Sequence, residues 1–105
     1  MARRVIFTIQ SPLGYRVTLT RNRWREIVHY KHPALTGSQQ AVRRCVERPI
    51  LIRESAKDSE VHLYYAPAGQ LHLCVVVAPA DAEDRFVVTA YFTKNIKKGK
   101  QRWTS

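Results

Sequence analysis

Hydroxyl side chains recur at every second position near the end of the chain, where residues 86–93 are Phe-Val-Val-Thr-Ala-Tyr-Phe-Thr. Alternate residues of an extended strand share a face. One face is therefore predicted to carry Phe86, Val88, Ala90 and Phe92, and the other Val87, Thr89, Tyr91 and Thr93. The hydroxyls could donate hydrogen bonds to phosphate oxygens, and the Tyr91 ring could stack on a base. Thr and Tyr are also typical of an ordinary half-solvated strand, so both interpretations stay open.

His32 is the residue best suited to move a proton. Cleavage of RNA without a metal ion needs a base for the 2′-hydroxyl, cations for the phosphorane and an acid for the departing 5′-oxygen. Imidazole exchanges protons near neutral pH, and Pro33 would fix the backbone of His32 at a helix end. A histidine that only caps helix carbonyls is the alternative.

Cations that could bind phosphate occur in two segments. Arg53 alternates with Ile52 and Glu54 in a short strand, so its guanidinium could project from the face opposite Glu54 and hold a phosphate bidentately. A basic tail is predicted over 94–105, where the side chains could follow an RNA backbone and stack one base or could simply be solvated. Its candidate RNA contacts are Lys94, Lys97, Lys98 and Trp103.

Histidine and cysteine spacing does not favour a metal or a cofactor. His29 and His32 are three residues apart, but no third ligand completes a recognisable pattern. Cys45 and Cys74 are interpreted as small core residues. We therefore predict neither a metal site nor a cofactor.

The charge balance favours an anionic partner. Lys and Arg total 18 against 8 Asp and Glu, which gives a net charge of +10 over 105 residues. Such a chain attracts polyanions, above all nucleic acid, although an acidic protein would also fit. The amino-terminal stretch does not resemble a signal peptide, and no apolar run is long enough to span a membrane. We expect a cytoplasmic protein that does not bind membranes.

Local patterns predict one domain over 1–105. Ser11-Pro12-Leu13-Gly14 separates two β-branched segments, 4–9 and 15–20, which predicts a hairpin. Thr20 or Asn22 would cap a helix that ends near His32, and Ser38 a second helix that Pro49 ends. Strands are expected at 50–54, 61–66, 70–79 and 85–93. The predicted fold is α+β, with the N-terminal hairpin and two helices packed on one face of a four- to five-stranded antiparallel sheet.

Several short motifs occur in one order: SPLG at 11–14, LT at 19–20 followed by Trp24 and Ile27, KHP at 31–33, Tyr64-Tyr65, and VVTAYFT at 87–93 followed by Lys94, Ile96, Lys97 and Gly99. In this order the chain resembles the phage-associated branch of the barnase, EndoU, colicin E5/D and RelE-like nuclease superfamily, from about Ile6 to Trp103. The resemblance implies a compact barnase/RelE-like α+β domain that cuts RNA without metal, often as a toxin with a cognate antitoxin or as part of a phage protein.

The resemblance favours His32, Thr89, Tyr91 and Thr93, together with Arg53 and Tyr65, as site residues. Alternation alone does not decide which of Tyr64 and Tyr65 joins the polar face. We assign catalysis to His32, Arg53, Tyr91 and Thr93, and RNA contacts to Tyr65, Thr89, Lys94, Lys97, Lys98 and Trp103. Barnase-like enzymes use a glutamate base, but Glu54 is predicted on the other face.

The expected function is a metal-independent endoribonuclease toxin that attacks RNA through the 2′-hydroxyl and leaves a 2′,3′-cyclic phosphate. The alternatives are a noncatalytic RNA-binding module and a protein-interaction domain of phage origin.

Overall fold

A computed structural model describes residues 4–80 and 84–105 of the chain. In chain order the elements are β1 (Val5–Gln10), β2 (Arg16–Thr20), α1 (Arg21–Glu26), the π-helical turn η1 (Ile27–Lys31), the 3-10 turn η2 (Pro33–Leu35), α2 (Gln39–Glu47), β3 (Leu51–Glu54), β4 (His62–Ala68), β5 (Leu71–Pro79), β6 (Asp84–Thr93) and β7 (Gln101–Thr104). The predicted α+β class is confirmed.

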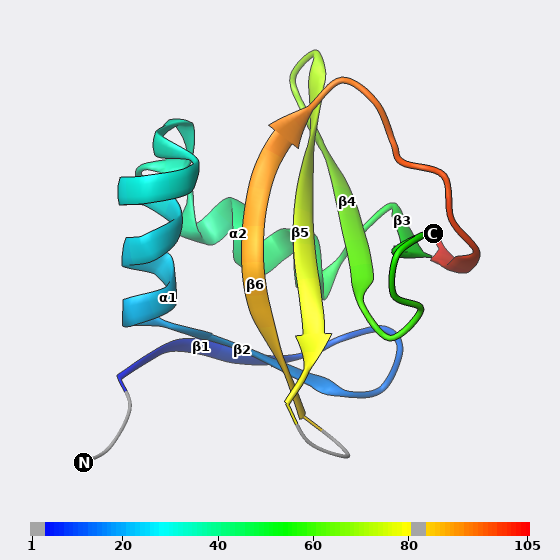
Figure 1. The fold of residues 1–105 in the computed structure, drawn as a ribbon, viewed down its shortest axis with the longest axis horizontal. Helices are drawn as coiled ribbons and strands as arrows, with labels where there is room; N and C mark the ends of the chain where they lie inside the picture. The colour runs from blue at the N-terminus through cyan, green and yellow to red at the C-terminus, as the bar shows by residue number, and fades with distance from the viewer. Residues whose placement is uncertain (1–3, 81–83) are drawn as a thin grey trace.

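All seven strands form one mixed sheet in the order β1-β2-β6-β5-β4-β3-β7. The prediction of four or five antiparallel strands is therefore wrong in number and in direction. The hairpin β1–β2 joins the same sheet, because Arg16, Val17 and Thr18 pair in parallel with Asp84, Arg85 and Phe86. In Figure 1 the two hairpin strands run across the bottom, at a steep angle to β4, β5 and β6.

The predicted first helix begins at Arg21, directly after its N-cap residue Thr20. The Thr20 side-chain oxygen accepts a hydrogen bond from the Arg23 amide, which satisfies one free N–H of the first turn. Trp24 and Ile27 are buried in the core. From Ile27 the helix widens into η1, and the His32 amide closes it by donating to the Ile27 carbonyl. Pro33 then begins η2, so His32 stands at the junction of the two turns.

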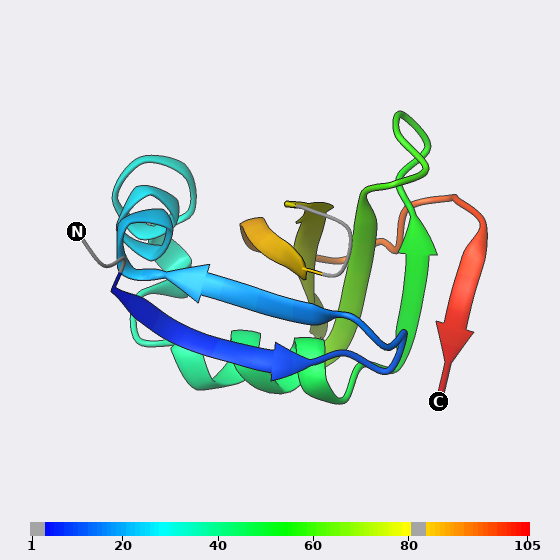
Figure 2. The same cartoon turned by 90° about the horizontal axis from the view of Figure 1, so that it is seen from below.

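Helix α2 covers one face of the sheet. Its buried residues Val42, Cys45 and Val46 recur at helical spacing and pack with sheet residues such as Tyr64 and Val75. Figure 1 shows α2 behind the strands, and Figure 2 shows α1 standing beside β6. Residues of α1 and η1 nevertheless belong to the same core as α2.

The sheet face turned away from α2, which we call the front face, is seen in Figure 1. Strand register places its residues in rows, since directly paired residues share a face. One row is Tyr91, Cys74, Tyr65 and Leu51; the next is Thr89, Val76, Leu63 and Arg53; a third is Thr93, His72 and Pro67.

An irregularity in β6 changes the predicted alternation. Val77 pairs with Val87, but Val76 pairs with Thr89, so Val88 is an extra residue in β6. As a result Val87 is fully buried in the α2-covered core, together with Ala90, and not on the front face as the alternation predicted. Phe86, predicted on the core face, pairs with Ala78 and lies on the front face instead. Thr89, Tyr91 and Thr93 keep the predicted face.

Residues 101–104 form strand β7, so the segment predicted as a basic tail ends in the sheet. β7 pairs with β3, and the Glu54 amide donates to the Lys100 carbonyl at 2.8 Å. The connection of residues 94–100 runs from the top of β6 to β7 (Figure 1), and Ile96 packs against the front-face cluster of Leu51, Leu63, Tyr65 and Cys74. None of the helices within residues 4–80 and 84–105 has the length and apolar character needed to cross a membrane.

Candidate functional site

The Tyr91 ring is the centre of the candidate site. Its centroid lies 5.6 Å from that of the His32 ring, which approaches from the η1–η2 junction. The Lys97 ammonium nitrogen lies 5.5 Å from the same Tyr91 centroid, within the range of a cation–π contact. A proton carrier, a phenol and a cation from three distant segments therefore meet on the front face.

Lys97 is held in place by two backbone hydrogen bonds. Its amide donates to the Tyr65 hydroxyl at 3.1 Å, and its carbonyl accepts from Arg53 Nη1 at 3.0 Å. Tyr65 and Arg53 come from the neighbouring strands β4 and β3. The connection is thus fixed to the sheet at the point where its lysine reaches Tyr91.

Unpartnered polar atoms gather on this face. Among the described residues, the buried side-chain atoms without a hydrogen-bond partner are Arg53 Nε, His72 Nδ1, Thr89 Oγ1 and Tyr91 OH. All four belong to the front-face rows. Buried polar groups in proteins are normally hydrogen-bonded, so a cluster of free ones indicates a surface that water or a polar ligand completes.

Both tyrosines of the site are neutral hydroxyl donors near neutral pH. Burial is the main cause that raises the pKa of Tyr91 above its ordinary value, and the neighbouring Cys74 thiol adds to the effect. Burial likewise raises the pKa of Tyr65 to about 12, against the lowering effect of the Lys97 amide. The Tyr65 hydroxyl accepts the Lys97 N–H, whereas the buried Tyr91 hydroxyl lies beside the Cys74 thiol.

The structure brings together His32, Arg53, Thr89, Tyr91 and Lys97, but it places other predicted site residues differently. Tyr65 is fully buried and supports Lys97, so its ring is not available to a base. The Thr93 hydroxyl bonds to Asn95 and closes the turn after β6. Trp103 pairs with Ile52 and packs on the core behind the sheet, so it cannot stack with Tyr91 on a shared base. Lys94 and Lys98 are exposed in the connection.

Glu54 lies on the face opposite Arg53, as the alternation predicted. It pairs with His62 across the strands and forms an ion pair with Arg102 at 3.3 Å. It is therefore not placed to serve as a base beside Tyr91.

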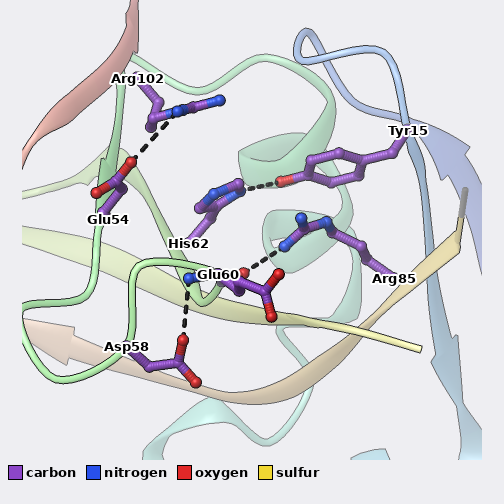
Figure 3. A network of polar contacts seen from close by, with 7 residues as sticks. All are labelled: Tyr15, Glu54, Asp58, Glu60, His62, Arg85 and Arg102. Atoms are coloured by element: carbon purple, nitrogen blue, oxygen red, sulfur yellow. Dashed lines mark hydrogen bonds and ion pairs between the residues drawn. The ribbon is translucent and has the colours of Figure 1, made fainter. Parts of the chain in front are cut away.

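A second polar network on the α2 side is shown in Figure 3. The Tyr15 hydroxyl and His62 Nδ1 are 2.8 Å apart, and the Arg85 guanidinium lies over the Tyr15 ring and donates to the Glu60 carbonyl. His62 is only 4% exposed, and burial, with Arg85 and Arg102 nearby, lowers its pKa to about 4. Because the ring is enclosed and neutral, this network fastens the hairpin turn to the sheet and does not form an open site.

His72 lies on the front face, which the sequence reasoning did not predict. Its place in a strand without a second histidine nearby favours a surface or packing role, yet it lies in the front-face row with Thr93, and its Nδ1 has no partner. The sequence does hold one indication of this placement: His72 is two residues from Cys74 on β5, so the two side chains share a face. That signal becomes informative only when the register with Tyr91 and Thr93 is known.

Comparisons with known proteins give no relative: no family model, no curated protein and no solved structure matches this chain. No group of three or more His, Cys, Asp or Glu side chains within residues 4–80 and 84–105 could hold a metal ion.

Proposed function

We propose that this protein is a metal-independent endoribonuclease that cleaves RNA by attack of a 2′-hydroxyl on the adjacent phosphate. The observation that carries the proposal is the contact of His32 and Lys97 with Tyr91, on a face where four buried polar atoms of the described residues lack partners. The net charge of +10 supports a polyanionic substrate.

In the proposed reaction His32 removes the proton of the 2′-hydroxyl, and the 2′-oxygen bonds to phosphorus. The Tyr91 hydroxyl donates to a nonbridging oxygen, while the Lys97 ammonium and the Arg53 guanidinium offset the charge of the phosphorane. The bond from phosphorus to the 5′-oxygen then breaks. That oxygen takes a proton, for which His72 is our candidate donor, and the products are a 2′,3′-cyclic phosphate and a 5′-hydroxyl.

The nuclease superfamily, the place of action and the partner are also part of this proposal. The motif order supports a barnase/RelE-like nuclease that acts in the cytoplasm as a toxin or within a phage-related element, with a cognate antitoxin as partner. The sheet with α2 on one face and polar groups on the other fits the compact α+β domain that the resemblance implies.

The test is cleavage of total RNA by wild type, His32→Ala and His29→Ala, each with a chelator present. His29 is the matched control, because it is an exposed histidine of the same turn. Loss of one acid–base group predicts a rate about 10²- to 10⁴-fold lower for His32→Ala, with His29→Ala unchanged. The ends made by wild type should carry a cyclic phosphate.

Three outcomes would contradict the proposal in whole or in part. Cleavage that leaves no cyclic phosphate would exclude the mechanism. Tight RNA binding without cuts in any sample would identify a noncatalytic RNA-binding module, and unchanged cleavage by His32→Ala would remove this residue from the reaction.

A further inference from the structure

A basic cleft lies near the start of β6, away from Tyr91. It has a volume of about 860 Å³ and is bounded by β2, by α1 and by Phe86 of β6. Four arginines line it: Arg4, Arg21, Arg23 and Arg25. In Figure 2, α1 follows the tip of β2 and lies to the left of β6, which is gold.

The arginines are set in place by the backbone and are largely free to bind an anion. The Arg21 amide donates to the Arg4 carbonyl at 3.0 Å, which joins the start of α1 to the residue before β1. Glu26 also lines the cleft, but it lies 3.8 Å from Arg23 only. Within the described part of the chain, the side chains of Arg4, Arg21 and Arg25 form no ion pair or hydrogen bond.

The cleft also offers a flat surface. The Arg23 guanidinium carbon lies 5.6 Å from the centroid of the partly exposed Phe86 ring. Bases of single-stranded RNA stack on aromatic rings and on guanidinium planes. An acidic protein would be attracted by the charge but has no bases to stack on the Phe86 ring. The combination of arginines and an aromatic ring therefore favours RNA.

Phe86 and Tyr91 belong to the same face of the sheet. Phe86 pairs with Ala78 and Tyr91 with Cys74, and these two β5 residues are four positions apart, on the same side of the strand. Because Val88 is an extra residue, the distance along the sheet is that of the four β5 steps from Ala78 to Cys74, which corresponds to about 13 Å. That span exceeds a single nucleotide.

We infer that the cleft of Arg4, Arg21, Arg23, Arg25 and Phe86 is a secondary subsite that binds the RNA backbone and one base a few nucleotides from the phosphate at Tyr91. The inference rests on the proposed function for its substrate class. A subsite in the cleft would make the protein bind oligonucleotides that reach both the cleft and Tyr91 more tightly than shorter ones.

The test measures binding of 2′-O-methyl RNA, which lacks the attacking hydroxyl, at several salt concentrations. One probe has about 12 nucleotides and the other, a dinucleotide, is too short to reach both places. The variant is Arg21→Gln/Arg25→Gln. The matched control is Arg43→Gln/Arg44→Gln, which removes the same charge from exposed positions of α2. A third protein, Phe86→Leu, keeps an apolar side chain but removes the ring.

If the cleft binds RNA, the Arg21/Arg25 variant binds the long probe roughly tenfold more weakly. Its plot of log affinity against log salt becomes shallower by about 1.4, because two phosphates of the single strand are no longer neutralised. Phe86→Leu also weakens binding of the long probe by roughly tenfold. The short probe, and the α2 control with either probe, change little.

Equal behaviour of the Arg21/Arg25 variant and the α2 control would overturn the inference and leave the nuclease proposal standing. If wild type binds the long probe through the cleft but cleaves no natural RNA, the cleft is supported and the nuclease proposal fails. If wild type binds neither probe, both fail.

Discussion

The Tyr91 hydroxyl is buried and neutral, and among the described residues it has only the weakly bonding Cys74 thiol beside it, so its removal separates function from stability. We expect Tyr91→Phe to reduce kcat about 10²- to 10³-fold, because a donor to the phosphorane is lost. The free energy of unfolding should stay equal or rise by up to about 1 kcal/mol, since an unsatisfied buried hydroxyl is removed. Cleavage kinetics and urea denaturation measure the two effects.

Tyr65→Phe is the control for that experiment, because the Tyr65 hydroxyl has a partner in the Lys97 amide. Its loss should cost about 1 kcal/mol of stability and should also release Lys97. A Tyr91→Phe protein that loses stability without losing activity would show that the hydroxyl serves the fold and not the reaction.

His62 gives the protein a pH-dependent stability at a site away from the front face. Its pKa is about 4 in the folded protein against an ordinary value of 6.5, because burial and then Arg85 and Arg102 disfavour the charged ring. The unfolded state binds a proton more readily, so the stabilisation is complete above about pH 6.5 and is lost as the pH falls toward 4. Between about pH 7.5 and pH 5 the loss should be about 1–2 kcal/mol.

Urea denaturation of wild type and His62→Gln at both pH values checks this expectation. Glutamine can accept the Tyr15 hydroxyl hydrogen but does not titrate, so the variant should lose that part of the pH dependence. If the free energy of unfolding depended on pH equally in both proteins, the pH dependence would come from another group.

At the scale of elements, the connection of residues 94–100 positions Lys97, and Gly99 is where it touches the sheet. A Cβ at Gly99 would lie 2.1 Å from the Glu54 carbonyl oxygen, so the backbone would have to move. We expect Gly99→Ala to cost about 1–3 kcal/mol of stability and to lower cleavage by the folded protein, because Lys97 is displaced from Tyr91.

Gly69→Ala is the matched control for this substitution. Gly69 has φ of 62° in a turn with open space around it, so alanine strains the backbone without touching the connection. Its stability should fall by about 1–2 kcal/mol, with cleavage per folded molecule unchanged. If both glycine variants lowered cleavage equally, the connection would not be the cause.

Elements defined by local signals could be predicted from the sequence. The Thr20 cap, the stop at Pro33 and the Val42, Cys45 and Val46 stripe each depend on residues within one turn of the helix. The β2–β6 parallel pairing, the extra residue Val88 and strand β7 depend on partners distant in sequence. No local period reports such contacts, so the strand count and the face of Val87 were predicted wrongly.

The candidate site also divides into residues that local sequence indicates and residues whose placement depends on strand register. Residue type, position and the family resemblance point to His32 and Tyr91, and the structure places the centroids of their rings 5.6 Å apart. His72 was missed and Trp103 was placed on the RNA-binding side, because both depend on register: His72 pairs with Thr93, and Trp103 with Ile52 of the core. Tyr65 was placed on the correct face, but only packing shows that it is covered.

At the scale of the whole molecule, positive charge lies on two sides. The front side has the arginine cleft beside α1 and the lysines of the connection 94–100, whereas α2 has the exposed Arg43, Arg44 and Arg48 behind the sheet. Net charge attracts RNA to either side, so the charge alone does not choose between them. Among the described residues, the unpartnered buried polar atoms are all on the front face, and they favour that side.

Hydrogen exchange with and without a 2′-O-methyl oligonucleotide tests this choice. Amides of the first turn of α1 and of the connection 94–100 should exchange more slowly when RNA is bound, because a ligand that binds the native state suppresses local opening where it docks. Exchange of the α2 amides should slow only by the amount that RNA binding raises the global free energy of unfolding. Protection centred on α2 would instead place RNA behind the sheet, out of reach of His32, and the protein would then bind RNA without the means to cut it.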